Sequence, residues 1–427
     1  MKPLTPNASQ KIKKTPIGDI PVDWEVRKVS DVGEVQGGRQ RSPAFTSGKL
    51  RPYLRVANIH DGWIDIDDVL SMRFTDDEFR RYMLKPGDIL LNEGQSLELV
   101  GRCAIYRGFP GSCCFQNTLI RFCPGDAILS EFAHILFQYQ RLTGKFAAIA
   151  SQTTSIAHLG TSRFASMRLP VPSCVEQRGI VSAIGMWQRA TETTEKLLFA
   201  KRQLKIGLMQ QLLTGKRRFP AFGKNGKDGP HGWKAYHLGE LLKEVERPIE
   251  CNDDTLYHLV SVRRRSGGLF SRESLPGRDI LTKDLRVTRT GDFLISKMQV
   301  VHGACGLTTT EFDGKTISGS YIALVAKDPS VLDIEFFNYL SQMPFMYHLA
   351  LVSSYGVHIE KMTFDLNDYL HERIRIPPTI EEQKRITSTL NEANREIRTL
   401  ERELDALREQ KKGLMQKLLT GKVRVKV

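Results

Sequence analysis

Residues 207–216 read GLMQQLLTGK, and residues 413–422 read GLMQKLLTGK. These matching decapeptides end two 45-residue segments, 172–216 and 378–422, which align without a gap at an offset of 206 residues and share 21 of 45 positions. Unrelated segments of one chain do not reach that level of identity by chance. The sequence therefore contains an internal duplication, and we expect the fold to repeat as well.

Each copy is predicted to form one long helix. Ser173-x-x-Glu176 and Thr379-x-x-Glu382 have the pattern of a capping box, in which two side chains satisfy backbone N–H groups at the helix start. Gly215 and Gly421 stand where a residue in the left-handed conformation ends a helix. With about 40 residues between these signals, each helix is predicted to be roughly 60 Å long at about 1.5 Å per residue.

An apolar seam runs along both predicted helices. Apolar positions of the second copy alternate by steps of four and three, the spacing of a coiled coil. The first copy is more polar at these positions, and Leu197 and Leu204 could widen its seam. Lys205 and Lys411 share one seam position, where a polar side chain can fix the register. We expect pairing, and partner contacts, through Ile180, Trp187, Leu198, Leu208, Leu212, Ile386, Leu390, Ile397, Leu400, Leu404, Leu414 and Leu418. The alternative is two amphipathic helices packed on separate cores.

Composition and charge indicate a globular protein with a polyanionic partner. The 427 residues include 62 basic and 48 acidic side chains, a net charge of +14, which favours nucleic acid as the partner. No apolar run is long enough to cross a membrane, and Met1–Lys14 lacks the apolar core of a signal peptide. Seven cysteines, an odd number, are typical of a reducing compartment. We therefore expect a cytoplasmic protein with no membrane segment.

Two globular units alternate with the two helices. Ile20-Pro21-x-x-Trp24 is echoed by Gly229-Pro230-x-x-Trp233, and residues 87–91 by residues 291–295. Short apolar runs between turn residues, such as 119–122 and 321–325, predict strands, and one helix follows in each unit. The predicted fold is α+β with a pseudo-twofold duplication. The expected segments are a disordered basic extension (1–16), a first domain (17–171), a first helix (172–216), a linker (217–232), a second domain (233–377), a second helix (378–422) and a tail (423–427).

No complete catalytic, metal-binding or cofactor-binding pattern is found. Asp88, Glu93 and Gln95 could form a nuclease cluster, but the second unit has Lys297 at the position of Glu93. Asp88 and its equivalent Asp292 each follow a glycine and precede a strand, which predicts a role in a turn. The cysteines lack the close pairs of a zinc site, so we expect structural thiols. We predict a chain without catalytic residues, metal or cofactor of its own.

Basic and amide side chains gather in predicted loops of both units. Arginine, asparagine and glutamine form paired hydrogen bonds with base edges, whereas lysine and arginine also bind phosphates. Related domains with different polar residues at matching loops would read different sequences. The candidate DNA-binding residues are Arg39, Gln40, Arg41, Arg55, Asn58, His60, Asn92, Gln95, Gln116 and Asn117 in the first unit, and Arg263, Arg264, Arg265, Lys297, Gln299 and His302 in the second.

Short motifs occur in doubled order along the chain. They are Ile20-Pro21-x-x-Trp24, Lys85-x-Gly87-Asp88-Ile89-Leu90, Pro170-x-Pro172-x-x-x-Glu176-Gln177, Ile376-Pro377-Pro378-x-x-x-Glu382-Gln383 and the two Leu-Leu-Thr-Gly-Lys endings. In this order the chain resembles the specificity subunit of type I restriction-modification systems over almost its whole length. The resemblance implies two target recognition domains, each reading one half of a split double-stranded DNA sequence. It also implies that the helices pair antiparallel as a spacer and dock methyltransferase subunits.

The same resemblance places the chemistry in other subunits. The modification subunits would transfer methyl groups from S-adenosylmethionine to adenine, and the restriction subunits would use ATP and Mg²⁺ to translocate and cut DNA. Two other readings stay open. The chain could be a DNA-cleaving enzyme with an unrecognised nuclease site, or a coiled-coil scaffold whose basic surface is incidental.

Overall fold

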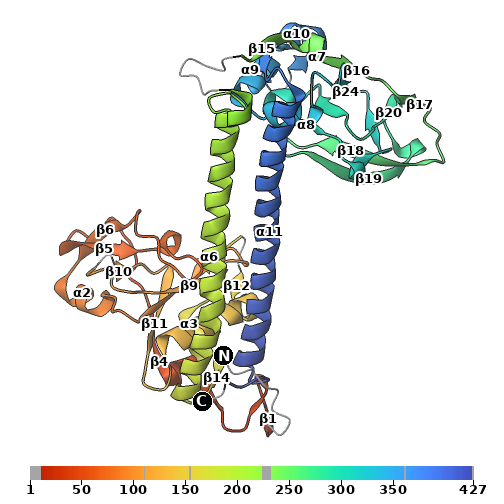
Figure 1. Ribbon diagram of the computed structural model, residues 1–427. Coiled ribbons are helices and arrows are strands. Elements are labelled where there is room, and N and C mark those ends of the chain that lie inside the picture. Colours follow the sequence, from red (N-terminus) through yellow and green to blue (C-terminus); the bar gives the residue numbers. More distant parts are fainter. Residues whose placement is uncertain (1–10, 110, 153–154, 224–231, 360–361, 426–427) are drawn as a thin grey trace. The chain divides into compact units, whose positions relative to one another are not determined.

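The computed structural model describes residues 11–109, 111–152, 155–223, 232–359 and 362–425 (Figure 1). They form two compact units. Unit 1 comprises Met1–Thr194 and Glu403–Val427, and unit 2 comprises Glu195–Arg402. Each unit thus holds one strand-rich domain and a part of each long helix. None of the helices in the described ranges combines the length and apolar character needed to span a membrane.

The two predicted long helices are α6 (Cys174–Leu212) and α11 (Ile380–Leu419). Ser173 Oγ and Thr379 Oγ1 accept hydrogen bonds from the backbone of Glu176 and Glu382 at 3.3 and 3.4 Å, as a helix start requires. The other half of the predicted capping boxes is wrong, because both glutamate carboxylates bind arginines instead. Gly215 and Gly421 have φ of +67° and +71°, which confirms the left-handed ends.

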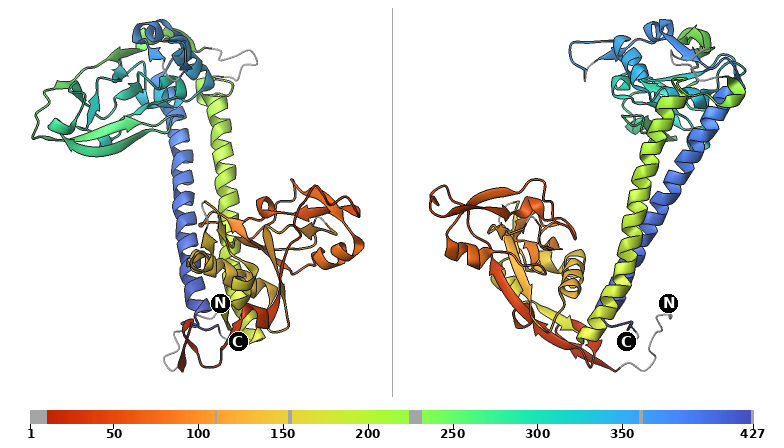
Figure 2. Two further views of the ribbon diagram at one scale, coloured as in Figure 1. Left: turned by 180° about the vertical axis from the view of Figure 1, so that it is seen from behind. Right: turned by 60° about the vertical axis from the view of Figure 1, so that its left-hand side comes forward.

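The helices pair antiparallel and lie side by side in the views of Figures 1 and 2. In unit 1, Lys411 Nζ donates to Gln188 Oε1 at 2.5 Å, and in unit 2 Lys201 Nζ lies 2.6 Å from Glu396 Oε2. These contacts between the helices confirm the predicted pairing. Every predicted seam residue is buried or half-buried, and those near the helix ends also pack on the core of their own domain. Leu197 and Leu204, which could have widened the seam, are 45% and 54% exposed and do not do so.

Both strand-rich domains contain the same four-stranded antiparallel sheet. In domain 1 its order is β4-β11-β7-β9, and in domain 2 it is β16-β24-β21-β22. The strands are β4 (Gly33–Gly37), β11 (Leu119–Pro124), β7 (Ile89–Asn92), β9 (Cys103–Ile105), β16 (Leu242–Glu244), β24 (Tyr321–Ala326), β21 (Phe293–Ser296) and β22 (Cys305–Leu307). They include the strands that the sequence predicts.

One helix covers each of these sheets, as predicted: α3 (Ser130–Leu142) and α8 (Ile334–Leu340). A strand phenylalanine meets a helix phenylalanine edge-on in both domains. The ring centroids are 5.3 Å apart for Phe122 and Phe137 and 4.9 Å apart for Phe293 and Phe337. Such apolar contacts drive the association of helix and sheet. The cores extend over the ends of α6 and α11 within their own unit.

The second sheet differs between the domains. Domain 1 has the order β10-β5-β6, and domain 2 has β17-β20-β23-β18-β19. The strands are β5 (Lys49–Leu54), β6 (Leu70–Phe74), β10 (Cys114–Phe115), β17 (Pro248–Ile249), β18 (Leu256–Val262), β19 (Leu269–Pro276), β20 (Leu285–Val287) and β23 (Thr316–Ser318). The duplicated scaffold therefore carries a common sheet next to the long helices and a variable sheet beyond it.

Short elements complete the domains. The strands are β3 (Glu25–Lys28) with β14 (Arg168–Val171), β15 (Lys234–His237) with β27 (Arg373–Ile376), β8 (Gly94–Gln95) with β13 (Ala157–His158) and β12 (Ser151–Gln152), and β25 (Ser354–Tyr355) with β26 (Thr363–Phe364). The helices are α1 (Val29–Val32), α2 (Asp76–Tyr82), α4 (Lys145–Ile149), α5 (Thr161–Ser166), α7 (Leu238–Leu241), α9 (Pro344–Val352) and α10 (Leu366–His371), with 3₁₀ turns η1 (Val56–Asn58), η2 (Pro220–Phe222), η3 (Gly277–Asp279), η4 (Val300–His302) and η5 (Thr310–Phe312).

In both domains, an equivalent glycine allows an aromatic ring to pack directly against the backbone. Gly101 and Gly303 have φ of +74° and +71°. A Cβ atom on Gly101 would lie 2.2 Å from the ring of Phe146, and one on Gly303 would lie 2.2 Å from Tyr347. Only glycine satisfies both the backbone conformation and the space.

The structure corrects the predicted ends of the chain. Residues 12–15 of the expected disordered extension form β1 (Ile12–Thr15), paired antiparallel with β2 (Gly18–Pro21), because Gly18 at φ +106° allows a tight turn. Residues 1–10 lie outside the described ranges, as do 224–231 of the linker and 426–427 of the tail. The described part of the tail is not free, since Val423 and Val425 pack against the core of unit 1.

Candidate nucleic-acid interface

The structure brings five of the six predicted residues of domain 2 together. Residues 263–268 form the turn between β18 and β19, and this turn packs against η4. The Arg265 N–H donates to the carbonyl of His302 at 2.7 Å, and Arg264 Nε donates to Gln299 Oε1 at 2.5 Å. The Arg263 guanidinium lies 4.6 Å from the centre of the Phe270 ring. The result is a surface with three exposed arginines, a glutamine and a histidine.

This turn holds an unusual backbone conformation. Arg265 and Ser266 have φ of +57° and +52°, and they are the described non-glycine residues with positive φ. The Ser266 hydroxyl forms a 2.6 Å hydrogen bond with the Tyr347 hydroxyl, and its N–H donates to the carbonyl of Gly303 at 2.8 Å. Left-handed residues other than glycine store strain and concentrate at functional sites. These contacts hold the arginines in a fixed position.

Lys297, the sixth predicted residue, lies at the other end of the same segment. Its carbonyl accepts a 3.1 Å hydrogen bond from Phe364 N in β26, which places the β25–β26 hairpin next to it. Sequence reasoning missed the exposed side chains of this hairpin. Tyr355 is 60% exposed and Val357 is 96% exposed. The available signal was the pair of large side chains at the end of β25 and two residues beyond it, because such side chains usually avoid water.

In domain 1, two loops close on each other at the end of the common sheet. The Arg39 N–H donates to the carbonyl of Phe115 at 3.1 Å, and Asn117 N donates to the carbonyl of Arg39 at 3.0 Å. These bonds place Gln40 and Arg41, which are exposed, next to the loop of Gln116 and Asn117. Four predicted residues therefore share one edge of the domain.

Three predicted contacts in domain 1 are corrected, because their side chains are buried. Arg39 is 6% exposed and bonds Glu78 at 2.8 Å, with the Phe45 and Phe74 rings beside it. Asn58 is 1% exposed and donates to two backbone carbonyls at 3.0 Å. Asn92 is fully buried, and neither polar atom of its side chain has a hydrogen-bond partner within the described residues. Arg39 and Asn58 hold neighbouring segments of the domain, and none of the three side chains is exposed at the surface.

The remaining candidates of domain 1 are half-buried. Arg55 is held by Asp68 at 2.5 Å, and Gln95 lies in β8. The His60 ring stacks on Trp63 with 4.2 Å between ring centroids. Trp63 is 56% exposed and was missed by sequence reasoning, although an exposed tryptophan commonly marks a binding surface.

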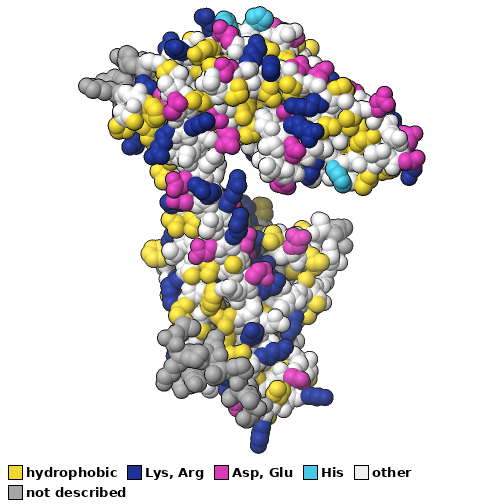
Figure 3. Space-filling model, turned by 45° about the vertical axis from the view of Figure 1, so that its right-hand side comes forward, with side chains coloured by type: hydrophobic (Ala, Val, Ile, Leu, Met, Phe, Trp, Pro, Cys, Tyr) yellow, Lys and Arg dark blue, Asp and Glu magenta, His cyan; other side chains and the backbone are white. Residues whose placement is uncertain are grey.

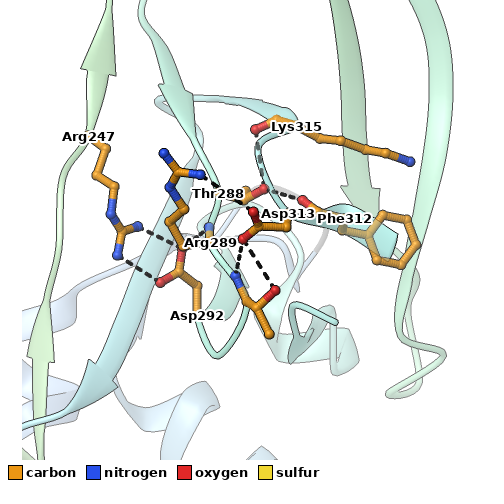
Figure 4. A network of polar contacts seen from close by, with 8 residues as sticks. Arg247, Thr288, Arg289, Asp292, Phe312, Asp313 and Lys315 are labelled. Atoms are coloured by element: carbon orange, nitrogen blue, oxygen red, sulfur yellow. Dashed lines mark hydrogen bonds and ion pairs between the residues drawn. The ribbon is translucent and has the colours of Figure 1, made fainter. Parts of the chain in front are cut away.

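The suggested nuclease cluster does not form. Asp88 Oδ2 accepts from Lys85 N at 2.8 Å, and Asp292 Oδ2 accepts from Arg289 N at 2.7 Å, which confirms the turn role of both aspartates. Figure 4 shows Asp292 also held by Arg247. Glu93 lies at the far end of β7, where it bonds His158 at 3.0 Å. No group of metal-ligating side chains occurs among the described residues.

All seven cysteines are free. Burial raises the pKa of Cys305 to about 11 and those of Cys113 and Cys114 to about 12. A thiol with such a pKa stays protonated at neutral pH and is a poor nucleophile or metal ligand. The expectation of structural thiols agrees with this environment.

Two ion pairs at equivalent positions fasten the ends of the long helices. In unit 2, Arg218 follows α6 and binds Glu382 at the start of α11 at 2.6 Å. In unit 1, Arg424 follows α11 and binds Glu176 at the start of α6, and it also binds Asp23 at 2.7 Å. Hydrogen bonds from Arg424 hold the pKa of the Asp23 carboxyl below its ordinary value. The predicted seam residues face the paired helix or the core of their own domain, and Trp187, Leu208, Leu400 and Leu414 stay half-buried.

The neighbouring glutamines attach each helix to its own domain. Gln177 Oε1 accepts from Leu129 N at 2.8 Å, and Gln383 Oε1 accepts from Asp333 N at 2.9 Å. The two Glu-Gln pairs of the sequence therefore have one explanation. The glutamate binds the arginine that follows the other helix, and the glutamine binds the domain.

On the surface in Figure 3, groups of Lys and Arg lie on the domain of unit 2, at the top, with Asp and Glu between them.

Comparison with known proteins agrees with this architecture. The family model for the type I restriction modification DNA specificity domain matches residues 21–198. The putative type I restriction enzyme MjaX specificity subunit of Methanocaldococcus jannaschii is 25% identical, covering 98% of this chain and 97% of its own length. The MjaIX specificity subunit of the same organism is 22% identical over 97% of this chain and 96% of its own.

Two solved structures share the fold. A chain from a study of complex assembly and conformational transition of the type I R-M system superposes with a TM-score of 0.61 at 16% identity, covering 94% of this chain and 99% of its own. The type I restriction-modification S subunit from M. genitalium gives a TM-score of 0.52 at 13% identity, covering 93% and 96%.

Proposed function

Because the chain belongs to the family of type I restriction-modification specificity subunits, we propose that its two domains each read one half of a split double-stranded DNA sequence. The chain is the DNA-recognition subunit and has no catalytic activity of its own. One observation supports the assignment of one half-site to each domain. The domains share the sheet next to the helices but differ in the sheet and loops beyond it. A common scaffold with different loops suits two different half-sites.

The surfaces assigned to DNA are the loops described above. In domain 2 they are the turn of residues 263–268 and the segment 297–302, and in domain 1 they are the loops of residues 40–41 and 116–117. Arginine and amide side chains at such positions supply both phosphate contacts and base-edge contacts.

The proposal assigns docking of the methyltransferase subunits to the outer faces of α6 and α11, and ATP-dependent restriction subunits complete the complex. S-adenosylmethionine, ATP and Mg²⁺ belong to those partners in this assignment. The cytoplasm is the compartment where the DNA and such partners meet.

Mapping of methylated adenines in a host that carries the complete system tests the division of recognition. Arg264→Ala should relax or weaken one half of the methylated motif, and Arg41→Ala should affect the other half. A good base contact contributes about 1–3 kcal/mol of discrimination, so the preference for the original base at the contacted position should fall roughly 5- to 150-fold. Equal changes in both halves from either variant would contradict the proposal.

A further inference from the structure

The duplicated chain has two clefts at equivalent places, each between a domain helix and a long helix. In unit 1 the cleft has a volume of about 210 Å³ and lies between α3 and α6. In unit 2 it has a volume of about 610 Å³ and lies between the start of α8 and α11. Because lining positions on α6 and α11 are related by the offset of 206 residues, the two clefts can be compared side chain by side chain.

In unit 1 the charges that line the cleft balance, with Arg107 and Lys411 against Glu131 and Glu192. The seam lysine, Lys411, donates to Gln188 Oε1 at 2.5 Å, and Gln188 Nε2 donates to Glu192 Oε1 at 2.6 Å. The carboxylate of Glu192 thus ends a hydrogen-bonded row that begins at the ammonium group. His134 also lines this cleft, and burial lowers its pKa to about 4, so it adds no charge at neutral pH.

In unit 2 the same row cannot form. The equivalents of Lys411, Gln188 and Glu192, at the offset of 206 residues, are Lys205, Asn394 and Arg398. Asn394 Nδ2 donates to the Tyr339 hydroxyl instead, at 2.6 Å. A cation therefore replaces the carboxylate. Burial lowers the pKa of the Lys205 ammonium group, and the charge of Arg398 lowers it further.

The unit 2 cleft carries an excess of positive charge. Lys384, Arg395 and Arg398 line it, and none of the three forms a salt bridge within the described ranges. The two acidic residues of the lining are occupied. Asp333 accepts from Thr387 Oγ1 at 3.0 Å, and Glu335 accepts from Asn391 Nδ2 at 3.1 Å.

We propose that this cleft binds an acidic segment of a partner protein, whose carboxylates pair with Arg398, Arg395 and Lys384. A protein segment fits better than a DNA backbone, because its carboxylates can be spaced to meet the cations and avoid Asp333 and Glu335, whereas a DNA backbone carries a phosphate at every nucleotide. Arginine binds carboxylates through two parallel hydrogen bonds, which gives both affinity and orientation.

The inference rests on the proposed function, since the partner meant is the methyltransferase subunit. It adds that the two docking positions differ. In unit 1 the chain itself supplies the negative charge, through Glu192, whereas in unit 2 the partner must supply it.

The test uses the full chain and the purified methyltransferase subunit of the same restriction-modification system, with binding measured by calorimetry over a range of salt. Arg398→Glu should weaken binding by about tenfold to a hundredfold and reduce its salt dependence, whereas Arg398→Lys should keep most of the affinity. Arg402→Glu is the matched control, because Arg402 is exposed on α11 but does not line the cleft. DNA affinity, measured by gel shift, should be equal in all four proteins.

The outcomes separate the two proposals. Unchanged binding by Arg398→Glu, or an equal loss with Arg402→Glu, overturns the cleft assignment and leaves the proposed function standing. A loss of DNA affinity in Arg398→Glu with intact protein binding assigns the cleft to phosphates and also overturns the inference. If the wild-type chain does not bind the methyltransferase subunit, docking through the helices is wrong and the inference falls with it.

Discussion

Replacing Arg218 by methionine tests the ion pair that fastens α6 to α11 in unit 2. Arg218 Nε and Nη2 donate to the two carboxylate oxygens of Glu382 at 2.8 and 2.6 Å. The side chains are 8% and 1% exposed, so the variant leaves a buried carboxylate without a cation. Removal of one partner of a buried pair costs about 3–5 kcal/mol. For a unit of this size, each kcal/mol lowers the midpoint by about 2–4 °C, so unfolding of unit 2 should begin roughly 6–20 °C earlier.

The equivalent pair in unit 1 supplies the control. In Arg424→Met, Glu176 keeps its 2.9 Å hydrogen bond from Trp24 Nε1, and Arg424 is more exposed than Arg218, at 23%. The loss should be smaller, about 1–3 kcal/mol. The Arg218→Met and Glu382→Gln double variant should recover much of the lost stability, because no buried charge remains.

Calorimetry and urea unfolding of the four proteins give the comparison, and limited proteolysis assigns each transition to its unit. An unchanged midpoint for Arg218→Met would refute the reasoning. So would equal losses for both arginine variants, or a double variant as unstable as the single one.

Three further predictions concern the helices. Lys205→Met should raise the free energy of unfolding of unit 2 slightly, by less than about 1 kcal/mol after solvent screening. Lys411→Met should bring no such gain, since the Lys411 ammonium group has a hydrogen-bond acceptor. Because the pKa of Lys205 is lowered, its charge opposes folding below that pKa, so the gain should shrink as pH rises toward the ordinary value of 10.5; a gain that grows with pH would contradict this. Leu404→Asp, at a position 6% exposed, should cost several kcal/mol and abolish assembly with the methyltransferase subunit, which co-purification would detect. Seven residues inserted after residue 200, with seven more after residue 399 of the facing helix, should lengthen the unspecified gap of the methylated motif by about three base pairs, whereas an unchanged gap in an active complex would show that the helices do not set the spacing.

The insertion illustrates what the sequence leaves open. The repeat offset suggests residue 406 as the matching position, because 200 and 406 are equivalent in the duplication. In the antiparallel pair, however, Lys201 faces Glu396, so the matching insertion belongs near residue 399. An offset relates copies of a segment, whereas a contact depends on the direction in which two helices run, and the apolar spacing is the same for both directions.

The sequence by itself determined the features that depend on local rules. The four-and-three spacing, the serine and threonine caps and the left-handed glycines have nearly the same physical meaning in any protein, because they act within one or two helical turns. The common strands and the turn aspartates Asp88 and Asp292 followed from short patterns for the same reason.

Only the tertiary structure decided which polar side chains remain free to bind. Arg39 and Arg41 are two residues apart in the sequence, yet Glu78 and two aromatic rings hold the first, while the second is exposed. The same holds for Glu176 and Glu382, whose carboxylates have the spacing of a helix cap but bind arginines more than 160 residues away in the chain. Buried charges take the strongest partner within reach, and the partners within reach are set by contacts between distant segments that no local pattern records.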